Sequence, residues 1–313
     1  MDAPQNTSLH LTRPEGSAPE DFHMSRRGVA GLFFFGYAAA VSPVNAEAIT
    51  TPDTGLFTRN LTIPPLKDEG GYQIPAYVAM PAAPGKHKVI IVVNEIFGLH
   101  DWIRDMCRRF ARQGYCALAI DFFARKGNAP ATADMQALQA IVAQAKYPQV
   151  MDDIRAQIAW LKSEPAIFGD SGGQPGGGAF ADTGHIGITG FCWGGTPVWM
   201  AAATIPEIKA GVAFYGRLEK SANATEDRPY PIDIAASLAK PVLGFYADGD
   251  KGIGQDSVAR MNAALAASGK TPSHLVVVPN AQHGFMADYR PSYSAEGARM
   301  AWPQMLDWFA KYV

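Results

Sequence analysis

The chain has 313 residues, of which 48% are hydrophobic and 18% are charged, and its formal net charge is -2 at pH 7. This composition is typical of a soluble globular protein with a large core, and the length suits one large α/β domain or two small ones. A near-neutral chain without a basic stripe is not expected to bind nucleic acid. The cysteines are too few for a disulfide framework, so buried free thiols are expected at Cys107 and Cys116.

The N-terminus has the pattern of an export signal. Residues 1–23 are polar and are expected to be a disordered leader. Twin arginines follow, Arg26 and Arg27, then an apolar run from Val29 to Val41 and a small-residue cleavage site after Ala46. This segment resembles a twin-arginine (Tat) signal peptide, which predicts a periplasmic rather than a cytoplasmic protein. The alternative is an apolar N-terminal helix that packs on the domain.

The apolar run is shorter than the roughly 18 residues that a membrane-spanning helix needs, and no other stretch approaches that length. We therefore expect no stable membrane anchor. Residues 1–46 are interpreted as leader plus Tat-like signal peptide, and residues 47–313 as a single α/β domain.

Downstream of this segment the periodicity predicts a sheet covered by helices. Alternating apolar and polar residues predict an edge strand over 56–63 with a hairpin partner over 74–80, and the β-branched run 88–93 predicts a strand buried on both faces. Predicted helices and strands then alternate: helix 101–113, strand 115–120, helices 132–146 and 150–163, strand 186–191, a helix to Thr204, strands 210–215 and 241–246, helix 255–267, strand 274–278 and helix 294–312. This order predicts an α/β fold with a mostly parallel central sheet and helices on both faces.

Two details of this pattern carry specific expectations. Pro303 is expected to kink or split the last helix. The Gly-rich stretch 169–184 precedes a strand and lacks a following Lys-Ser or Lys-Thr, so it is expected to be a flexible insertion rather than a phosphate-binding loop.

The segment Gly190-Phe191-Cys192-Trp193-Gly194 has the Gly-x-nucleophile-x-Gly spacing of a strand-to-helix elbow, with a cysteine at the nucleophile position. Glycines two residues either side of the apex let the strand and the helix pass closely. The N-terminus of the following helix favours a thiolate at Cys192. A buried cysteine in a glycine-rich turn is the alternative interpretation.

Two further candidate catalytic residues, Asp250 and His283, each follow a predicted strand. With Cys192 they give the chain order nucleophile, acid, histidine that this elbow architecture uses. His283 would move the proton, and Asp250 would accept a hydrogen bond from the other imidazole nitrogen and fix its tautomer. Asp248 competes with Asp250 for the acid position, and either could be a turn residue instead.

Taken together, these motifs resemble the dienelactone hydrolase family of α/β-hydrolases over roughly residues 56–313. The resemblance rests on Asn94-Glu95-Ile96-Phe97-Gly98, Asp121-Phe122-Phe123-Ala124-Arg125, the cysteine elbow extended to Gly195, Asp250 and His283-Gly284-Phe285. It implies an α/β-hydrolase fold and a Cys-His-Asp triad that hydrolyses anionic lactones or small esters without a metal or an organic cofactor.

The resemblance also implies roles for individual residues. Glu95 would contact and help to activate the thiol, and the backbone N–H groups of Ile96 and Trp193 would form the oxyanion hole. Arg125 would bind a substrate carboxylate, and Arg290 is a second candidate with a looser match. A carboxylesterase or thioesterase of the same fold, and a non-catalytic or redox-thiol protein on this scaffold, are the alternative functions.

Overall fold

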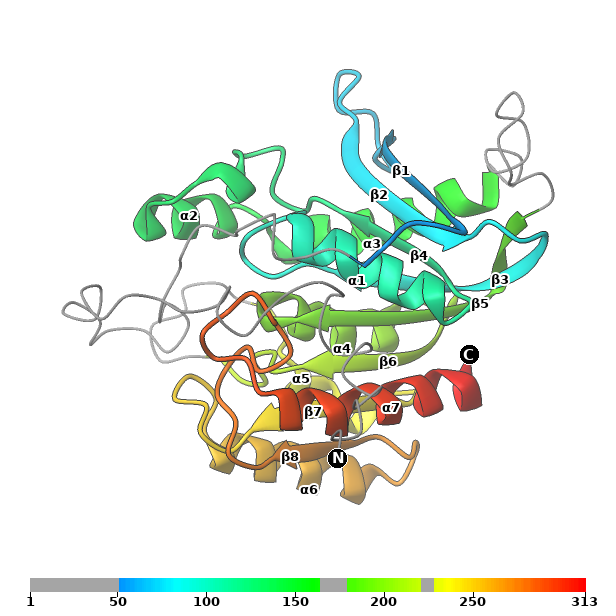
Figure 1. The fold of residues 1–313 in the computed structure, drawn as a ribbon. Helices are drawn as coiled ribbons and strands as arrows, with labels where there is room; N and C mark the ends of the chain where they lie inside the picture. The colour runs from blue at the N-terminus through cyan, green and yellow to red at the C-terminus, as the bar shows by residue number, and fades with distance from the viewer. Residues whose placement is uncertain (1–50, 164–178, 221–227) are drawn as a thin grey trace, which may run out of the picture.

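The computed structural model describes residues 51–163, 179–220 and 228–313. The predicted leader and signal peptide lie outside these ranges. In the described part, eight strands form one sheet in the order β1-β2-β4-β3-β5-β6-β7-β8 (Figure 1). No helix in these ranges combines the length and the apolar character that crossing a bilayer requires.

Strands β3 to β8 are mutually parallel, and the hairpin β1–β2 adds antiparallel strands at one edge. The strands are β1 (Leu56–Ile63), β2 (Ile74–Pro81), β3 (Gly85–Val93), β4 (Cys116–Ile120), β5 (Ala179–Phe191), β6 (Ile208–Phe214), β7 (Val242–Ala247) and β8 (His274–Val278). The predicted mostly parallel sheet is confirmed. Because parallel strands share a direction, the loops after β3, β5, β6, β7 and β8 gather at one edge of the sheet.

Helices cover both faces of this sheet, as predicted. They are α1 (Asp101–Arg112), α2 (Met135–Val142), α3 (Tyr147–Ser163), α4 (Gly195–Thr204), α5 (Pro231–Ile234), α6 (Gln255–Ser268) and α7 (Ala295–Tyr312). A Cβ on Gly187 of β5 would meet Phe309 of α7, whereas a Cβ on Gly211 of β6 would meet Val198 of α4. Gly211 pairs with Ile188, the neighbour of Gly187, so α7 and α4 lie on opposite faces (Figure 1).

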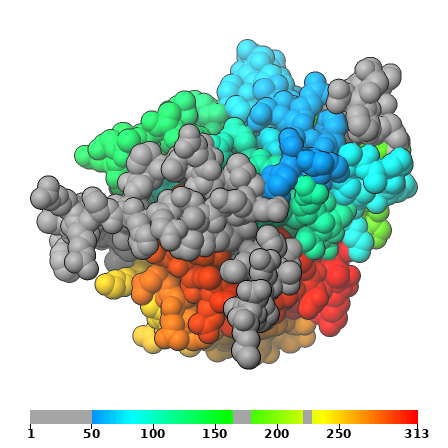
Figure 2. Space-filling view, in the orientation of Figure 1, coloured from blue at the N-terminus to red at the C-terminus, as the bar shows by residue number. Residues whose placement is uncertain are grey.

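The strand order places the β1–β2 hairpin and β8 at opposite edges of the sheet. In the space-filling view, the β1–β2 hairpin, coloured blue to cyan, lies at one end of the molecule, and α6 and α7, coloured orange and red, lie at the other (Figure 2). Cys107 and Cys116 are buried free thiols, as predicted.

Three local predictions require correction. Residues 169–178 of the predicted Gly-rich insertion lie outside the described ranges, and residues 179–182, predicted as part of it, extend β5 and pair with Gly85–Lys88 of β3. Helix α3 begins at Tyr147 rather than at residue 150, since Pro148 is tolerated in a first helical turn. Helix α7 runs without a break through Pro303.

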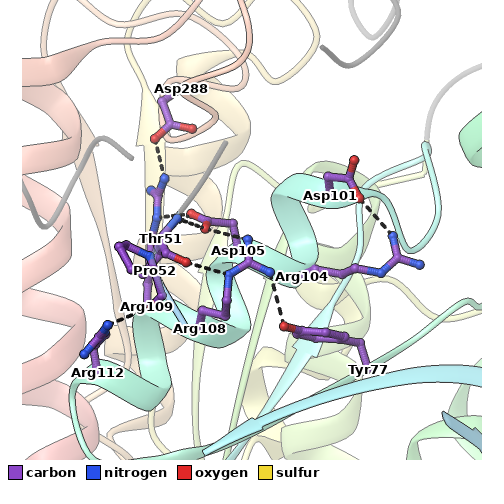
Figure 3. Close-up of polar contacts among 10 residues, drawn as sticks. All are labelled: Thr51, Pro52, Tyr77, Asp101, Arg104, Asp105, Arg108, Arg109, Arg112 and Asp288. Atoms are coloured by element: carbon purple, nitrogen blue, oxygen red, sulfur yellow. Dashed lines mark hydrogen bonds and ion pairs between the residues drawn. The ribbon is translucent and has the colours of Figure 1, made fainter. Parts of the chain in front are cut away.

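A buried ionic network attaches the start of the described chain and the loop after β8 to α1 (Figure 3). Asp105 accepts hydrogen bonds from the backbone N–H of Thr51 at 2.7 Å and from Nε of Arg109 at 2.7 Å. Nη2 of the same Arg109 guanidinium donates to Oδ2 of Asp288 at 2.5 Å. Arg109 therefore links helix α1 to the loop that carries His283 and Arg290.

Candidate active site

Cys192 lies at the sharp turn between β5 and α4. Its backbone has φ of 54°, a left-handed conformation that is costly for a residue with a side chain. A single 3-10 turn, Cys192–Gly194, connects the end of β5 to Gly195, the first residue of α4. The thiol is therefore held at the carboxyl end of a central strand and at the N-terminal end of a helix.

The glycines of this turn are required by close backbone contacts. A Cβ on Gly190 would lie 2.3 Å from the carbonyl oxygen of Gly194, and a Cβ on Gly194 would lie 2.5 Å from the carbonyl oxygen of Asn94. Both distances are far below van der Waals contact. The second contact also means that the loop after β3 packs directly against the elbow.

His283 and Asp250 come together from the loops after β8 and β7. Nδ1 of His283 lies 2.7 Å from Oδ2 of Asp250. The other oxygen of Asp250 accepts the N–H groups of Gly252 at 2.8 Å and Ile253 at 3.2 Å. These two bonds fix the carboxylate, which in turn fixes the orientation of the imidazole.

Asp248 has a different set of partners. Its carboxylate oxygens accept the backbone N–H groups of Asn280 at 3.0 Å and Ala281 at 3.2 Å. Asp248 therefore connects the loops after β7 and β8. Of the two acids that the sequence left open, Asp250 is the one bonded to the histidine.

The imidazole of His283 also interacts with Cys192, whose charge acts to raise the pKa of this histidine. Since Nδ1 faces Asp250, Nε2 is the nitrogen left for the sulfur. Burial acts to lower the pKa of His283, but the negative charge of Cys192 and the bond to Asp250 outweigh it and raise this pKa to about 9. The arrangement favours a protonated imidazole at neutral pH.

Glu95 is fully buried at the end of β3 and is held by the segment that follows His283. Oε2 accepts the phenol O–H of Tyr289 at 2.5 Å, and Oε1 accepts Nη1 of Arg290 at 3.1 Å. Nε2 of His100 lies 3.5 Å from Oε2. Burial acts to raise the pKa of Glu95, but Arg290, His100 and Tyr289 hold it below its ordinary value.

Arg290 pairs with this carboxylate and also interacts electrostatically with Cys192. Burial opposes its charge, but Glu95, Tyr289 and Cys192 together raise the pKa of its guanidinium. The buried Arg290 is therefore paired with Glu95 within the protein, and its predicted contact with a substrate carboxylate stays a prediction.

Arg125 also has partners within the protein. Its guanidinium donates to both oxygens of Asp153, at 2.8 and 2.9 Å, and to Glu69 at 2.6 Å. The guanidinium carbon lies 4.9 Å from the ring centre of Tyr72. Two carboxylates of the protein therefore neutralise this arginine, and its predicted contact with a substrate carboxylate stays a prediction.

The N–H groups of Ile96 and Trp193 flank the elbow. Trp193 is in the first turn of a helix, where N–H groups have no partner within the helix. Among the described residues, none accepts a hydrogen bond from the N–H of Ile96. Because Gly194 packs against the carbonyl of Asn94, these two donors come from adjoining loops, as an oxyanion hole requires.

Several residues around the thiol could not be assigned from sequence. Tyr215 follows β6 with φ of 40°, and its ring centre lies 5.0 Å from that of His283. His100 and Tyr289 contact Glu95. Tyr289 is adjacent to Arg290 in the sequence, which is the one signal that could have drawn attention to it.

A cavity of about 270 Å³ borders the elbow. Ile96 and Trp193 form part of its wall, and Arg217 and Arg228 also line it. Within the described part of the chain, no three His, Cys, Asp or Glu side chains are grouped as the ligands of a metal ion would be.

The sequence of this chain is similar to those of known hydrolases. The model of the dienelactone hydrolase family matches residues 74–313. A protein of Methylorubrum extorquens named "Putative carboxymethylenebutenolidase" is 44% identical over 292 residues, which cover 92% of this chain and 94% of the relative. A protein of Bradyrhizobium sp named "Probable 2-oxo-3-(5-oxofuran-2-ylidene)propanoate lactonase" is 29% identical and covers 74% of this chain and 86% of its own length.

A solved structure is also similar to this chain, both in sequence and in fold. The crystal structure titled as a "Putative Dienelactone Hydrolase" from Klebsiella pneumoniae superposes with a TM-score of 0.72 at 39% identity, covering 82% of this chain and 99% of that one. An acylaminoacyl peptidase of Pyrococcus horikoshii, 17% identical with a TM-score of 0.63 over 82% of this chain and 42% of that one, shares the fold alone. The chain therefore belongs to the dienelactone hydrolase family and is a carboxylic ester hydrolase with the α/β-hydrolase fold.

Proposed function

We propose that the protein hydrolyses lactones and small carboxylic esters through an acyl-thiolate intermediate on Cys192. The observation that carries this proposal is the position of the His283 imidazole, which is bonded to Asp250 at 2.7 Å and interacts electrostatically with Cys192. A nucleophile, a base and an orienting acid in this relation are the parts that acyl transfer needs.

In the first half-reaction, the sulfur of Cys192 attacks the carbonyl carbon and forms a C–S bond. The carbonyl oxygen becomes an oxyanion, which accepts hydrogen bonds from the N–H groups of Ile96 and Trp193. Collapse of this intermediate breaks the C–O bond, and the leaving oxygen takes the proton from Nε2 of His283. With a lactone, the leaving alcohol stays attached to the acyl group.

In the second half-reaction, the neutral imidazole of His283 takes a proton from water as the water oxygen attacks the thioester carbon. The same two N–H groups bind the second oxyanion. Its collapse breaks the C–S bond and returns the thiolate, and the proton remains on His283. The products are an alcohol and a carboxylic acid, which releases its proton to solvent as a carboxylate; the two are joined in one hydroxy acid when the substrate is a lactone.

We assign Glu95 the role of a positioning residue near the thiol. A lone buried carboxylate would oppose a thiolate by like-charge repulsion, and Arg290 offsets that repulsion because its positive charge pairs with Glu95 and interacts with Cys192. In this role Glu95 fixes the position of Arg290, which interacts with Cys192. An activating contact between Glu95 and the thiol, which the family resemblance implies, is part of this proposal.

Turnover of dienelactone and 4-nitrophenyl acetate by the reduced enzyme tests the proposal. The wild type should hydrolyse at least one of them, and Cys192→Ala and His283→Ala should lose nearly all of that activity. Hydrolysis that survives in Cys192→Ala would exclude this nucleophile. A wild type inactive on both would favour the non-catalytic or redox-thiol alternative.

We also propose export through the twin-arginine route, on the pattern around Arg26, Arg27 and Ala46. N-terminal sequencing of the mature protein from fractionated cells tests this. A mature periplasmic protein that begins at Glu47 is expected, and a cytoplasmic protein that retains Arg26 and Arg27 would contradict export.

A further inference from the structure

The loop after β8 connects helix α1 to the surroundings of Glu95. In this loop Asp288 is fully buried, and its Oδ2 accepts a hydrogen bond from Nη2 of Arg109 in α1. The next two side chains, Tyr289 and Arg290, donate to the two carboxylate oxygens of Glu95. Because these three loop residues lie outside the strands and helices of the described chain, their orientation depends on such side-chain contacts.

Arg109 fixes the position of Asp288 relative to α1 (Figure 3). Its Nε donates to Oδ2 of Asp105, one turn earlier in the helix, at 2.7 Å. Asp105 is itself buried and accepts hydrogen bonds from the backbone N–H and the hydroxyl of Thr51. One guanidinium therefore binds a carboxylate of the helix and a carboxylate of the loop through different nitrogens, as the forked shape of arginine allows.

The start of α1 packs against the same surroundings. His100 directly precedes the helix, and its Nε2 lies 3.5 Å from Oε2 of Glu95. The ring centre of Trp102, in the first turn, lies 5.8 Å from that of Tyr289 and 4.8 Å from that of Phe191 at the end of β5. The first turn of α1 and its buried ion pair therefore support the groups around Glu95 at two places.

The position of Arg290 affects both catalytic side chains. Its guanidinium interacts electrostatically with Cys192. A Cβ on Gly284, the residue after His283, would lie 2.6 Å from Nη1 of Arg290, so the guanidinium packs against the backbone beside the imidazole. A misplacement of about 1 Å that starts far from the reacting atoms can lower a rate by a factor on the order of 10².

Stability alone gives a weak reason for the ion pair between Arg109 and Asp288. The desolvation of two buried charges offsets most of their attraction, and apolar side chains of similar size are often at least as stabilising. A charged hydrogen bond differs from apolar packing because it specifies both a distance and a direction. The pair is therefore suited to place the residues that follow Asp288.

We propose that Arg109 and Asp288 are positioning residues for the hydrolysis. The pair holds the loop after β8 on α1, so that Tyr289 and Arg290 stay bonded to Glu95. The two residues act through this carboxylate and its partners, and not by contact with the substrate. This assignment rests on the proposed function, in which Glu95 and Arg290 act on the catalytic thiol.

Asp288→Asn is the principal test variant, because it keeps the shape of the side chain and removes its charge. Burial raises the pKa of Asp288 to about 6, so the fold accepts a neutral group of this shape near that pH. The variant should lower kcat for 4-nitrophenyl acetate at least about tenfold and change KM less than about threefold. An unchanged kcat would overturn the proposal.

A double-mutant cycle with Glu95 separates positioning from a general effect on the fold. In the Glu95→Gln background, Asp288→Asn should lower kcat by less than about twofold, because the carboxylate through which it acts is already lost. Two structural effects that are independent of each other would instead multiply. A loss of the same size in both backgrounds would therefore overturn the proposal.

Two lysine substitutions form a matched pair. Arg108 and Arg109 both donate to Asp105, and the second side-chain partner of Arg108 is Tyr77 of β2. Lysine keeps the charge but lacks the fork that reaches two partners. Arg109→Lys should lower kcat at least about fivefold and Arg108→Lys less than about twofold. Urea denaturation of both variants measures the effect on the fold, and equal losses of kcat would contradict the role of Arg109.

The reactivity of the thiol tests the same role without turnover. The measurement is alkylation of Cys192 by iodoacetamide, followed by mass spectrometry of its peptide. The rate should fall at least about threefold in Asp288→Asn and in Arg109→Lys, because the neighbouring guanidinium loses its position. It should stay within about twofold of the wild-type rate in Arg108→Lys.

The two measurements separate the two proposals. A wild type that hydrolyses no ester would exclude the proposed function, and the alkylation rates would then decide whether the ion pair positions the groups around the thiol. Equal alkylation rates in wild type, Asp288→Asn and Arg109→Lys would overturn the positioning role.

Discussion

His283 is bonded to Asp250 and not to Asp248, although the two acids are two residues apart in one loop. The Nδ1–Oδ2 distance to Asp250 is 2.7 Å, whereas the carboxylate of Asp248 binds backbone N–H groups of Asn280 and Ala281. The two acids therefore have separable roles, one in orienting the imidazole and one in joining two loops.

Asp250→Asn should lower kcat by a factor on the order of 10³ to 10⁴, because the amide no longer selects the tautomer and no longer stabilises the imidazolium. Asp248→Asn is the matched control and should keep most of the activity while lowering the stability of the fold. Steady-state kinetics with 4-nitrophenyl acetate and urea denaturation measure the two effects. A larger kinetic loss in Asp248→Asn than in Asp250→Asn would reverse the assignment.

The raised pKa of His283 predicts an alkaline limit to activity. The first half-reaction needs a protonated imidazole to donate to the leaving oxygen, so kcat/KM should fall as pH rises through about 9. In Asp250→Asn this fall should move to lower pH, because the bond to Asp250 helps to raise the pKa. A profile of kcat/KM that stays flat well above this pH would contradict the acid role of His283.

The imidazole of His283 also makes the free energy of unfolding depend on pH. The pKa of His283 rises from its ordinary value of 6.5 to about 9 on folding, so the folded protein binds this proton more tightly than the unfolded chain. Its stabilising contribution is fully present below pH 6.5 and is lost as pH rises through about 9. The difference in unfolding free energy between wild type and His283→Gln should therefore shrink across that window.

Gly190→Ala should destabilise the protein by about 3 kcal/mol, since the added Cβ meets backbone atoms that cannot move aside independently. The closest of them is the carbonyl oxygen of Gly194, at 2.3 Å. Gly254→Ala is the control, because nothing lies within 4 Å of its Cβ position, and it should cost less than about 1 kcal/mol. Equal losses in urea denaturation would show that the close approach at the elbow does not require glycine.

Arg109→Met should cost about 3 to 5 kcal/mol, because it leaves Asp105 and Asp288 buried without their shared cation (Figure 3). Arg112→Met, on the exposed side of the same helix, should cost no more than about 1 kcal/mol. Chemical denaturation compares the two. A loss in Arg109→Met as small as that in Arg112→Met would mean that the network contributes little to stability.

The sheet, its flanking helices and the elbow were predictable because each depends on a local pattern: β-branched runs, helical periodicity and the spacing of Gly190 and Gly194. The start of β5 was not, because residues 179–182 form a strand only through pairing with β3. The partners of Arg125 could not be predicted from the sequence either. Glu69 and Asp153 come from distant parts of the chain, and nothing in the residues around Arg125 indicates them.

The central claim is that the acyl group is carried on the sulfur of Cys192. The direct measurement is rapid acid quench of the enzyme with excess 4-nitrophenyl acetate, followed by mass spectrometry of the intact chain and of its peptides. An acetyl group is expected on the peptide that contains Cys192, at a level that follows turnover and disappears as substrate is exhausted. An acetyl group that turns over on another residue, or full turnover by Cys192→Ala, would contradict the mechanism.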